Sequence, residues 1–271
     1  MEEIAARIAR VPGVAGVMLG GSRARGTNRP DSDWDLGVYY RGTPDLPALE
    51  ALAAEVTGGP VEIYPPGAWG PWVNGGAWLV LPDGGHVDWI FRDVDRVRRV
   101  WEDCRAGRFE IGIQAGHPLG FWSPAYPGEV ALGRILADDS GELSRLKEET
   151  QTYPEPLRKA LTGAAVWDAG FSVAMAAKSS AATDVLHAAL CLSRAVGALV
   201  QALHAHHRVW CLNEKGALAT VAALPHTPPD FALHATSLLG ELGRTEGQLR
   251  HSLALAEQLV AEVREVVTAD G

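Results

Sequence analysis

Two aspartates separated by one residue, Asp33 and Asp35, form the motif that most clearly indicates chemistry in this chain. They lie in the run 33–39, whose composition is typical of a β-strand. Successive side chains of a strand alternate between its two faces, so we expect both carboxylates on the same face. Two neighbouring carboxylates repel each other unless a cation lies between them, and oxygen ligands are those that Mg²⁺ prefers. The pair therefore predicts a site for a hard metal ion, although a turn followed by a solvent-facing strand would have the same sequence.

A glycine turn precedes the two aspartates. The run 14–19 predicts a strand, and Gly20, Gly21 and Ser22 follow it directly. Glycine allows the backbone to approach a ligand closely, and a helical turn that begins at Ser22 has free N–H groups that can hold a phosphate. We therefore expect an anion-binding turn next to an acidic strand.

A third carboxylate, Asp88, lies in a second region that is rich in β-forming residues. The runs 77–81 and 86–91 are joined by Pro-Asp-Gly-Gly, a strong hairpin signal. Within the second run, Asp88 falls on the face opposite to the three large apolar residues. This is the position expected of a metal ligand on a sheet, and the alternative is a single exposed strand acid.

The order Gly21-Ser22, then Asp33-Trp34-Asp35, then Asp88 resembles the nucleotidyltransferase superfamily that DNA polymerase β typifies. The resemblance covers residues 1–112. It implies that Asp33, Asp35 and Asp88 are catalytic and bind two Mg²⁺ ions. It also implies that Gly21, Ser22 and Arg25 bind a nucleoside triphosphate, with ATP as the first choice.

The second half of the chain is helical by its periodicity. The segments 154–177, 185–203 and 249–267 carry apolar residues at helical spacing and are joined by polar links, which is typical of an antiparallel bundle. We therefore predict an α+β fold. A nucleotidyltransferase domain with a mixed sheet would occupy residues 1–112, and a helical substrate-binding domain would occupy 113–271, including a connecting region at 113–152.

Four charged residues of the helical half are candidates for ligand contacts. Asp184, Leu192-Ser193-Arg194 and Lys215 occur in the same order as in the helical domain of the streptomycin/spectinomycin-type aminoglycoside adenylyltransferases, which this half resembles. We expect Arg194 and Lys215 to bind the nucleotide phosphates, and Asp184 and Asp168 to contact the acceptor. The residues leave structural alternatives open. Asp168 lies on an apolar stripe, where a carboxylate needs a partner; Asp184 would complement a helix dipole; and each cation could form an ordinary salt bridge.

Composition narrows the class of protein. Hydrophobic residues make up 47% and charged residues 21% of the chain, the balance of a globular protein. We expect a cytoplasmic protein without a membrane partner. The three cysteines are widely spaced, no apolar run approaches about eighteen residues, and the first ten residues lack a signal peptide's order. The net charge of −9 argues against extended nucleic-acid binding. A monomer and a homodimer both stay open.

These observations predict a Mg²⁺-dependent nucleotidyltransferase. We expect it to transfer AMP from ATP to a hydroxyl group of a small acceptor, such as an aminoglycoside-like antibiotic. The alternatives are nucleotidylation of a protein or tRNA, and a non-catalytic nucleotide-binding antitoxin or sensor; the presence of all three acids favours catalysis. The role of Trp69 and Trp72, in a loop rich in proline and glycine, stays open between a stacking platform or lid and a hydrophobic plug.

Overall fold

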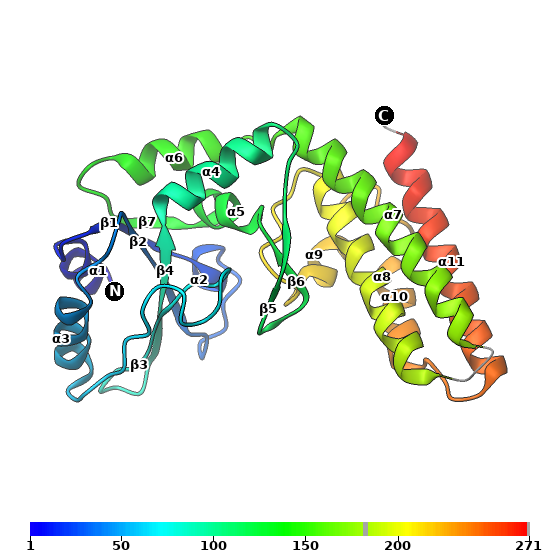
Figure 1. The fold of residues 1–271 in the computed structure, drawn as a ribbon, viewed down its shortest axis with the longest axis horizontal. Helices are drawn as coiled ribbons and strands as arrows, with labels where there is room; N and C mark the ends of the chain where they lie inside the picture. Colours follow the sequence, from blue (N-terminus) through cyan, green and yellow to red (C-terminus); the bar gives the residue numbers. More distant parts are fainter. Residues whose placement is uncertain (181–183, 270–271) are drawn as a thin grey trace. The chain divides into compact units, whose positions relative to one another are not determined.

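The computed structural model of the chain describes residues 1–180 and 184–269. It divides into two compact units (Figure 1). The first comprises Met1–Asp103 and Glu110–Thr152, and the second comprises Cys104–Phe109 and Tyr153–Gly271. The first unit combines a sheet with helices and the second is helical, so the predicted α+β fold is confirmed.

A five-stranded mixed sheet forms the centre of the first unit. Its strands, in spatial order, are β3 (Gly76–Val80), β4 (His86–Asp93), β2 (Trp34–Tyr40), β1 (Val14–Leu19) and β7 (Arg134–Ala137). Strands β2 and β4 are parallel, and every other neighbouring pair is antiparallel. The predicted strand 14–19 and the predicted β3–β4 hairpin are both present.

One face of this sheet is buried under two helices, α1 (Glu2–Ala9) and α3 (Leu46–Thr57). The alternation expected in β4 is observed, because Val87, Trp89 and Phe91 are fully buried while the residues between them face the other side. Full burial of a large apolar side chain stabilises a fold by about 1.5–3 kcal/mol. This face therefore anchors β4 and holds the opposite face, with its acids, in a fixed register.

Helix α3 has a recognisable start and end. The side chain of Asp45 accepts a hydrogen bond from the N–H of Ala48 at 3.0 Å, which caps the first turn. The helix ends at Gly58, whose φ of +78° is a conformation that glycine adopts without strain. The sequence at 45–56, closed by Gly58-Gly59-Pro60, indicates a helix, and the structure confirms it.

The structure differs from the sequence-based expectation around residues 61–64 and after residue 110. The sequence at 61–64 indicates a short strand, but the structure has only a single bridge there, between Tyr64 and Gly76. After residue 110 the β signal of the sequence fades, yet the structure has a two-stranded sheet of β5 (Ile111–Gln114) and β6 (His117–Trp122). These strands are too short, and too interrupted by glycine, for a clear two-residue period.

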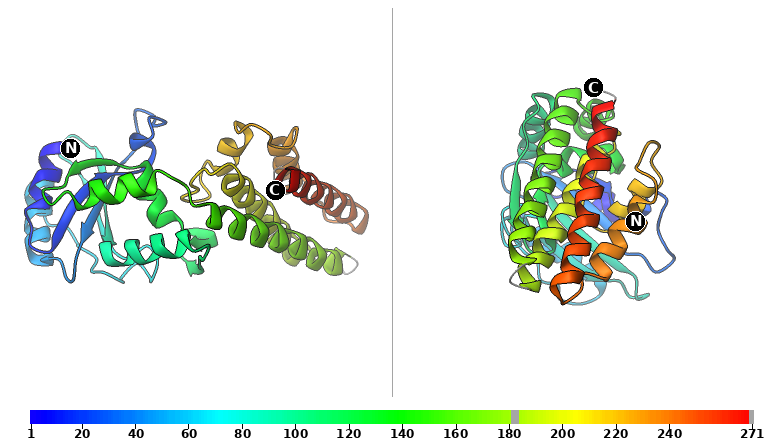
Figure 2. Two further views of the ribbon diagram at one scale, coloured as in Figure 1. Left: turned by 90° about the horizontal axis from the view of Figure 1, so that it is seen from above. Right: turned by 90° about the vertical axis from the view of Figure 1, so that its right-hand side faces the viewer.

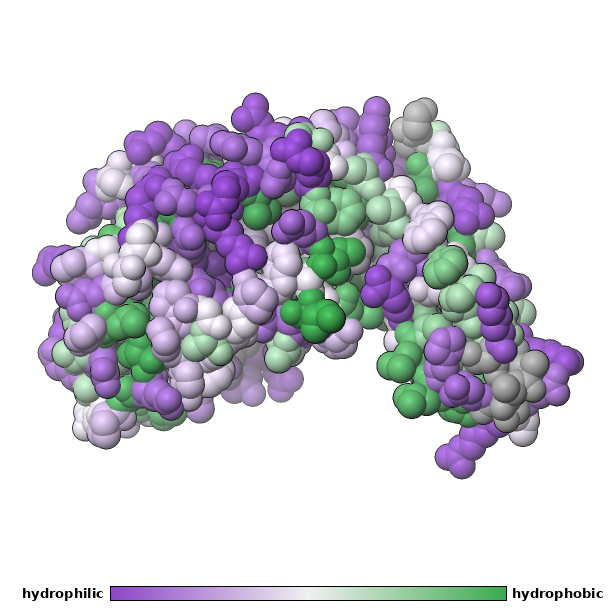
Figure 3. All heavy atoms as spheres, in the orientation of Figure 1, coloured by the Kyte–Doolittle hydropathy of each residue, from purple (hydrophilic) through white to green (hydrophobic). Residues whose placement is uncertain are grey.

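The region 113–152, which we expected to belong to the second domain, lies entirely in the first unit. The sequence at 129–137 indicates one short helix, but the structure has helix α5 (Ala125–Leu132) followed by strand β7 there. Strand β7 joins the edge of the main sheet next to β1. Pairing with a distant strand thus overrides the local helical pattern. Helices α4 (Val94–Arg105) and α6 (Glu142–Thr150) complete the unit and contribute to a hydrophilic surface (Figure 3).

The second unit is a bundle of helices, as predicted. It contains α7 (Glu155–Ser180), α8 (Val185–His206), α9 (Ala217–Ala222), α10 (Phe231–Gly240) and α11 (Glu246–Ala269). Helices α7 and α8 run alongside each other in opposite directions, and α11 packs against both (Figure 2). Leu192, Leu199 and Leu203 lie on the buried seam of α8.

Helices α7 and α8 are also long and apolar enough, by length and composition, to cross a membrane. The apolar windows of the two helices are 44% and 56% buried within the structure. Core helices of proteins without a membrane meet the same criterion, so this pair is weak evidence for a membrane segment.

Candidate active site

Asp35 and Asp88, which are far apart in the sequence, lie next to each other across the sheet. In the parallel ladder of β2 and β4, Asp35 is the register partner of Asp88. Neighbouring strands lie about 4.8 Å apart, so the two residues are adjacent. Both are on the face opposite to the buried core. Asp33 lies one residue before the start of β2 and is exposed, so the expected strand begins one residue later than the motif indicated.

The acids influence one another electrostatically. The pKa of Asp88 is raised from 3.8 to about 6, first by partial burial and then by the negative charges of Asp35 and Asp33, while His86 acts in the opposite direction. Like charges and desolvation both disfavour the ionised form. A cation bound at this face would relieve the repulsion, which is the electrostatic signature expected of a metal site.

The glycine turn lies directly against one of these acids. Gly21 begins the short helix α2 (Gly21–Ala24) with a φ of +61°. A Cβ atom at Gly21 would lie 1.7 Å from the Oδ2 atom of Asp35, and the N–H of Gly20 donates to the carbonyl of Asp35 at 2.7 Å. A side chain at this position would displace the Asp35 carboxylate and strain the backbone. The predicted phosphate-binding turn and the predicted metal-binding acid are therefore in contact.

The other two predicted phosphate-binding residues belong to the same turn. Ser22 is half-buried in α2, and its carbonyl accepts a hydrogen bond from the N–H of Thr27 at 3.0 Å. Arg25 is exposed, and its Nε donates to the carbonyl of Gly21 at 3.2 Å. The guanidinium group of Arg25 thus lies beside the turn rather than pointing away from it.

Arg23 is a residue of this site that the sequence did not reveal. Its Nε and Nη2 atoms donate to the carbonyl of Ser32 at 3.0 and 2.6 Å, and Nε also donates to the carbonyl of Asp33 at 3.2 Å. Its guanidinium group lies 4.2 Å from the centroid of the Trp34 ring. Arg23 therefore fastens the glycine turn to the loop that carries Asp33. In the sequence it is indistinguishable from Arg25, two residues further on.

The donor set fits magnesium in its chemistry. All three side chains are carboxylates, and Gly21 leaves the approach to Asp35 free of a side chain. Within residues 1–180 and 184–269, no three His, Cys, Asp or Glu side chains form a ready group for a metal ion. Mg²⁺ is usually bound by one or two carboxylates together with water and substrate phosphates, rather than by a closed protein cage. Asp35 and Asp88 satisfy that requirement, and Asp33 lies close enough to contribute charge.

The candidates of the helical unit have structural partners. Asp168 on α7 accepts two hydrogen bonds from Arg194 on α8, at 3.0 and 2.8 Å, which joins the two helices. Asp184 caps α8 by accepting the N–H of His187 at 3.1 Å. Lys215 has an exposed side chain. The structural alternatives that the sequence left open for Asp168, Arg194 and Asp184 are thus realised, and their roles in ligand binding stay predictions.

Comparison with known proteins supports the N-terminal assignment. Residues 1–62 match the family model of the nucleotidyltransferase domain. The chain carries a nucleotidyltransferase domain. The match includes Gly21, Ser22, Asp33 and Asp35 and ends before Asp88, so the third acid rests on the sheet register. The sequence-based prediction of a nucleotidyltransferase is confirmed, and nucleotidyl transfer is the general activity of this domain.

Two further comparisons add no activity to this nucleotidyltransferase. Residues 128–215 match a domain of unknown function (DUF4037). Among solved structures, the chain is similar to a nucleotidyltransferase-like protein from Exiguobacterium sibiricum 255-15, with 14% identity and a TM-score of 0.48 over 96% of this chain and 72% of that one. A likeness at this level supports no conclusion about activity. No curated protein matches the chain.

Proposed function

We propose that the chain is a Mg²⁺-dependent enzyme that transfers AMP from ATP to a hydroxyl group of a small molecule. One observation carries the proposal: Asp35 and Asp88 are register partners on parallel strands, and the backbone of Gly21 lies directly against Asp35. This arrangement supports the proposal, because the turn that would bind phosphate lies next to two carboxylates that would bind the metal.

The site residues of the first unit each have a role in this reaction. The N–H groups of the turn at Gly21 and Ser22, with Arg25, hold the phosphates of the nucleotide. The acceptor hydroxyl oxygen forms a bond to the α-phosphorus, the bond to pyrophosphate breaks, and pyrophosphate leaves. Asp88 accepts the hydroxyl proton. Asp88 suits this role by its place, since it is the register partner of Asp35 on the open face of the sheet.

Asp33, Asp35 and Asp88 are the residues that would hold the metal, for which we expect two Mg²⁺ ions. Bound there, Mg²⁺ would neutralise the charge of the phosphates and of the departing pyrophosphate. Phosphoryl-type transfer asks little covalent chemistry of the protein, so positioning by the turn and the acids supplies most of the rate.

The helical unit would complete the enzyme by binding the rest of the two substrates. In this proposal Arg194 and Lys215 contact the nucleotide phosphates, whereas Asp168 and Asp184 contact a cationic acceptor such as an aminoglycoside-like compound. Charge supports this division, because cations attract phosphates and carboxylates repel them. Arg194 would have to bind phosphate while it stays paired with Asp168, or exchange one partner for the other.

The test is a transfer assay with Mg²⁺ and ATP against a panel of small hydroxyl compounds, bulk tRNA and candidate proteins. Pyrophosphate release is measured together with the mass of the product, which gains one AMP. Asp35→Asn should abolish transfer. Asp83→Asn, which changes an exposed acid in the β3–β4 turn, is the matched control and should not.

Three results would contradict the proposal. Transfer to tRNA or protein alone would change the acceptor class. Nucleotide binding without pyrophosphate release in any mixture would indicate an antitoxin or sensor. Transfer that persists in Asp35→Asn would remove the acids from the mechanism.

A further inference from the structure

The row of acids on the open face of the sheet continues into a tryptophan. Trp78 on β3 is the register partner of Asp88 on β4, and Asp88 is in turn the partner of Asp35 on β2. Register partners on adjacent strands have their side chains on the same face. The backbone of Trp78 therefore lies about one strand spacing of 4.8 Å from that of Asp88, and both side chains extend from the same face of the sheet.

This indole is largely exposed although it is firmly held. The exposed fraction of Trp78 is 59%, whereas Ala77 and Leu79 on the other face of β3 are buried. Its ring stacks on Trp69 at a centroid distance of 4.4 Å and an angle of 20°, and it contacts Tyr64 at 5.3 Å. A tryptophan that only filled a hydrophobic gap under a loop would be buried, whereas much of the Trp78 ring is accessible to solvent. The three rings together, Tyr64, Trp69 and Trp78, are called the aromatic platform below.

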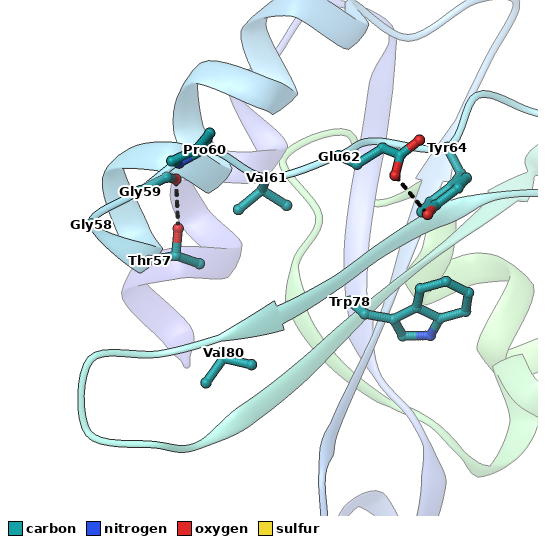
Figure 4. Close-up of a pocket in the computed structure, with 9 residues that line it drawn as sticks. All are labelled: Thr57, Gly58, Gly59, Pro60, Val61, Glu62, Tyr64, Trp78 and Val80. Carbon is teal, nitrogen blue, oxygen red and sulfur yellow. Dashed lines mark hydrogen bonds between the residues drawn. The ribbon is translucent and has the colours of Figure 1, made fainter.

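A cavity of about 430 Å³ adjoins the aromatic platform at the edge of the sheet. In Figure 4 the segment from Thr57 to Tyr64 runs along one side of this cavity, and the strand with Trp78 and Val80 runs along the other. The carboxylate of Glu62 accepts a hydrogen bond from the hydroxyl of Tyr64 at 2.7 Å. The lining residues include this acid and no Lys, Arg or His. The cavity thus combines an apolar ring surface with acceptor groups.

The order of residues across the sheet indicates which substrate the platform faces. The glycine turn lies against Asp35, so the phosphates belong on that side of the row. Trp78 lies on the far side of Asp88, the acid that takes the proton of the acceptor hydroxyl in the proposed reaction. A group that reaches Asp88 from the side away from the phosphates passes over Trp78.

We infer that the aromatic platform is the acceptor subsite and that the acceptor is a hydroxylated ring. The C–H face of such a ring stacks on Trp78 while one of its hydroxyl groups reaches Asp88. A cationic substituent would gain from the indole face and from the carboxylates of Asp88 and Glu62. This inference rests on the proposed function, because it identifies the acceptor from its place beside the proposed base.

The test is a binding measurement that needs neither ATP nor turnover. Saturation-transfer NMR is recorded with glucosamine as the ring probe and with glucamine, its open-chain relative. The ring protons of glucosamine should receive saturation from the protein, and glucamine should receive much less. Trp78→Ala should weaken glucosamine binding roughly three- to tenfold, as expected for the loss of one aromatic contact, and Trp78→Phe should retain most of it.

Two control variants complete the experiment. Trp167→Ala removes another exposed, stacked tryptophan, which lies 5.2 Å from Phe171 in the helical unit, and should leave binding unchanged. Asp35→Asn should still bind glucosamine while it loses transfer activity, so failure of the subsite and failure of the proposed reaction are distinguishable. Absence of glucosamine binding, equal binding of glucamine, or unchanged binding in Trp78→Ala would each overturn the subsite.

Discussion

Asp35 and Asp88 occupy the same register position on two parallel strands, so their carboxylates lie next to each other on the open face of the sheet. Fifty-two residues of sequence separate them in the chain, as their numbers show. The buried residues on the opposite face, Val87 and Trp89 among them, fix that register. The fold thus holds two like charges together at a site where a cation would be favourable.

This arrangement predicts a pH dependence of stability. The pKa of Asp88 is raised to about 6 in the fold, so the folded state holds its proton more tightly than the unfolded chain does. Protonated Asp88 therefore contributes to the free energy of unfolding below pH 4, and this contribution is lost as the pH rises through about 6. Asp88→Asn should remove this loss and be more stable than the wild type at pH 7, by on the order of 1 kcal/mol or less because the carboxylate is partly exposed.

Urea unfolding of both proteins from pH 4 to pH 7, without divalent cations, checks the prediction. Titrating groups away from this face are common to both proteins and cancel in the difference, so the difference reports on Asp88 and the neighbours coupled to it. If the free energies of unfolding of the two proteins changed in parallel from pH 4 to pH 7, the pKa of Asp88 would not be raised in the fold.

A second prediction concerns the contact between the glycine turn and Asp35. Gly21→Ala places a methyl group 1.7 Å from the Oδ2 atom of Asp35 in a backbone conformation with a φ of +61°. Gly26→Ala is the matched control, because Gly26 has a similar φ of +68° and no atom within 4 Å of the added Cβ. Gly26→Ala should cost about 1–2 kcal/mol from backbone strain alone.

Gly21→Ala should cost clearly more than its control in thermal melts and should also displace Asp35, so that nucleotide binding is lost. Ser22→Ala removes only a hydroxyl and should weaken nucleotide binding about tenfold or less. If Gly21→Ala and Gly26→Ala had the same melting temperature and bound the nucleotide equally well, the close approach of Gly21 to Asp35 would be unimportant.

A third prediction assigns Arg23 a positioning role. Arg23→Ala removes the hydrogen bonds to the carbonyls of Ser32 and Asp33 and the contact with Trp34. We expect the loop before β2 to become more accessible, and Mg²⁺-dependent nucleotide binding to weaken about tenfold or more, as for loss of charged hydrogen bonds. Arg29→Ala, which breaks an exposed ion pair with Asp31 in the same loop, should change little.

Limited trypsin cleavage of the Arg25–Gly26 bond, compared between Arg23→Ala and the wild type, reports on the order of this loop directly. This bond is the one to follow, because trypsin does not cleave Arg29–Pro30 and the variant lacks Arg23. A purely electrostatic role of Arg23 would leave the cleavage rate unchanged while nucleotide binding falls. Unchanged cleavage would therefore count against positioning.

A fourth prediction separates structure from ligand binding in the helical unit. Asp184 caps α8 through the N–H of His187, and asparagine caps as well as aspartate does. Asp184→Asn should thus leave the melting temperature unchanged, whereas Asp184→Ala should cost about 1 kcal/mol. Weaker binding of a cationic acceptor in Asp184→Asn would then report on the lost charge alone, and unchanged binding would confine Asp184 to capping.

The pair of Asp168 and Arg194 calls for a double-mutant cycle. Arg194→Ala leaves Asp168, whose side chain is only 18% exposed, without its bidentate partner. It should lower stability by about 1 kcal/mol, and the cycle with Asp168→Asn should show coupling of similar size. Nucleotide affinity, measured on the same variants, decides whether Arg194 also contacts phosphate.

The local parts of the site were predictable because each has a short-range signal. The alternation in 86–91 placed Asp88 on the correct face, and the glycines at 20 and 21 indicated a turn with close backbone approach. The proximity of Asp35 and Asp88 came only from the family resemblance, since the parallel pairing of β2 with β4 is a long-range contact that no local pattern encodes.

Other features were missed for the same reason. Strand β7 has four residues and a helical local pattern, and only its pairing with β1 makes it a strand. Arg23 is one arginine among several in a polar run. The role of the tryptophan loop was open in the sequence; in the structure Trp69 stacks on Trp78, whereas Trp72 packs against Phe121 at 5.8 Å.

The central claim is that the face with Asp35 and Asp88 binds a nucleotide through Mg²⁺. The most direct test is calorimetric titration of an ATP analogue that cannot be cleaved between the α- and β-phosphates, with and without Mg²⁺. We predict that Mg²⁺ strengthens binding to the wild type and to Asp83→Asn, and that Asp35→Asn loses this dependence on Mg²⁺. Equal Mg²⁺-dependent binding by Asp35→Asn and the wild type would contradict it.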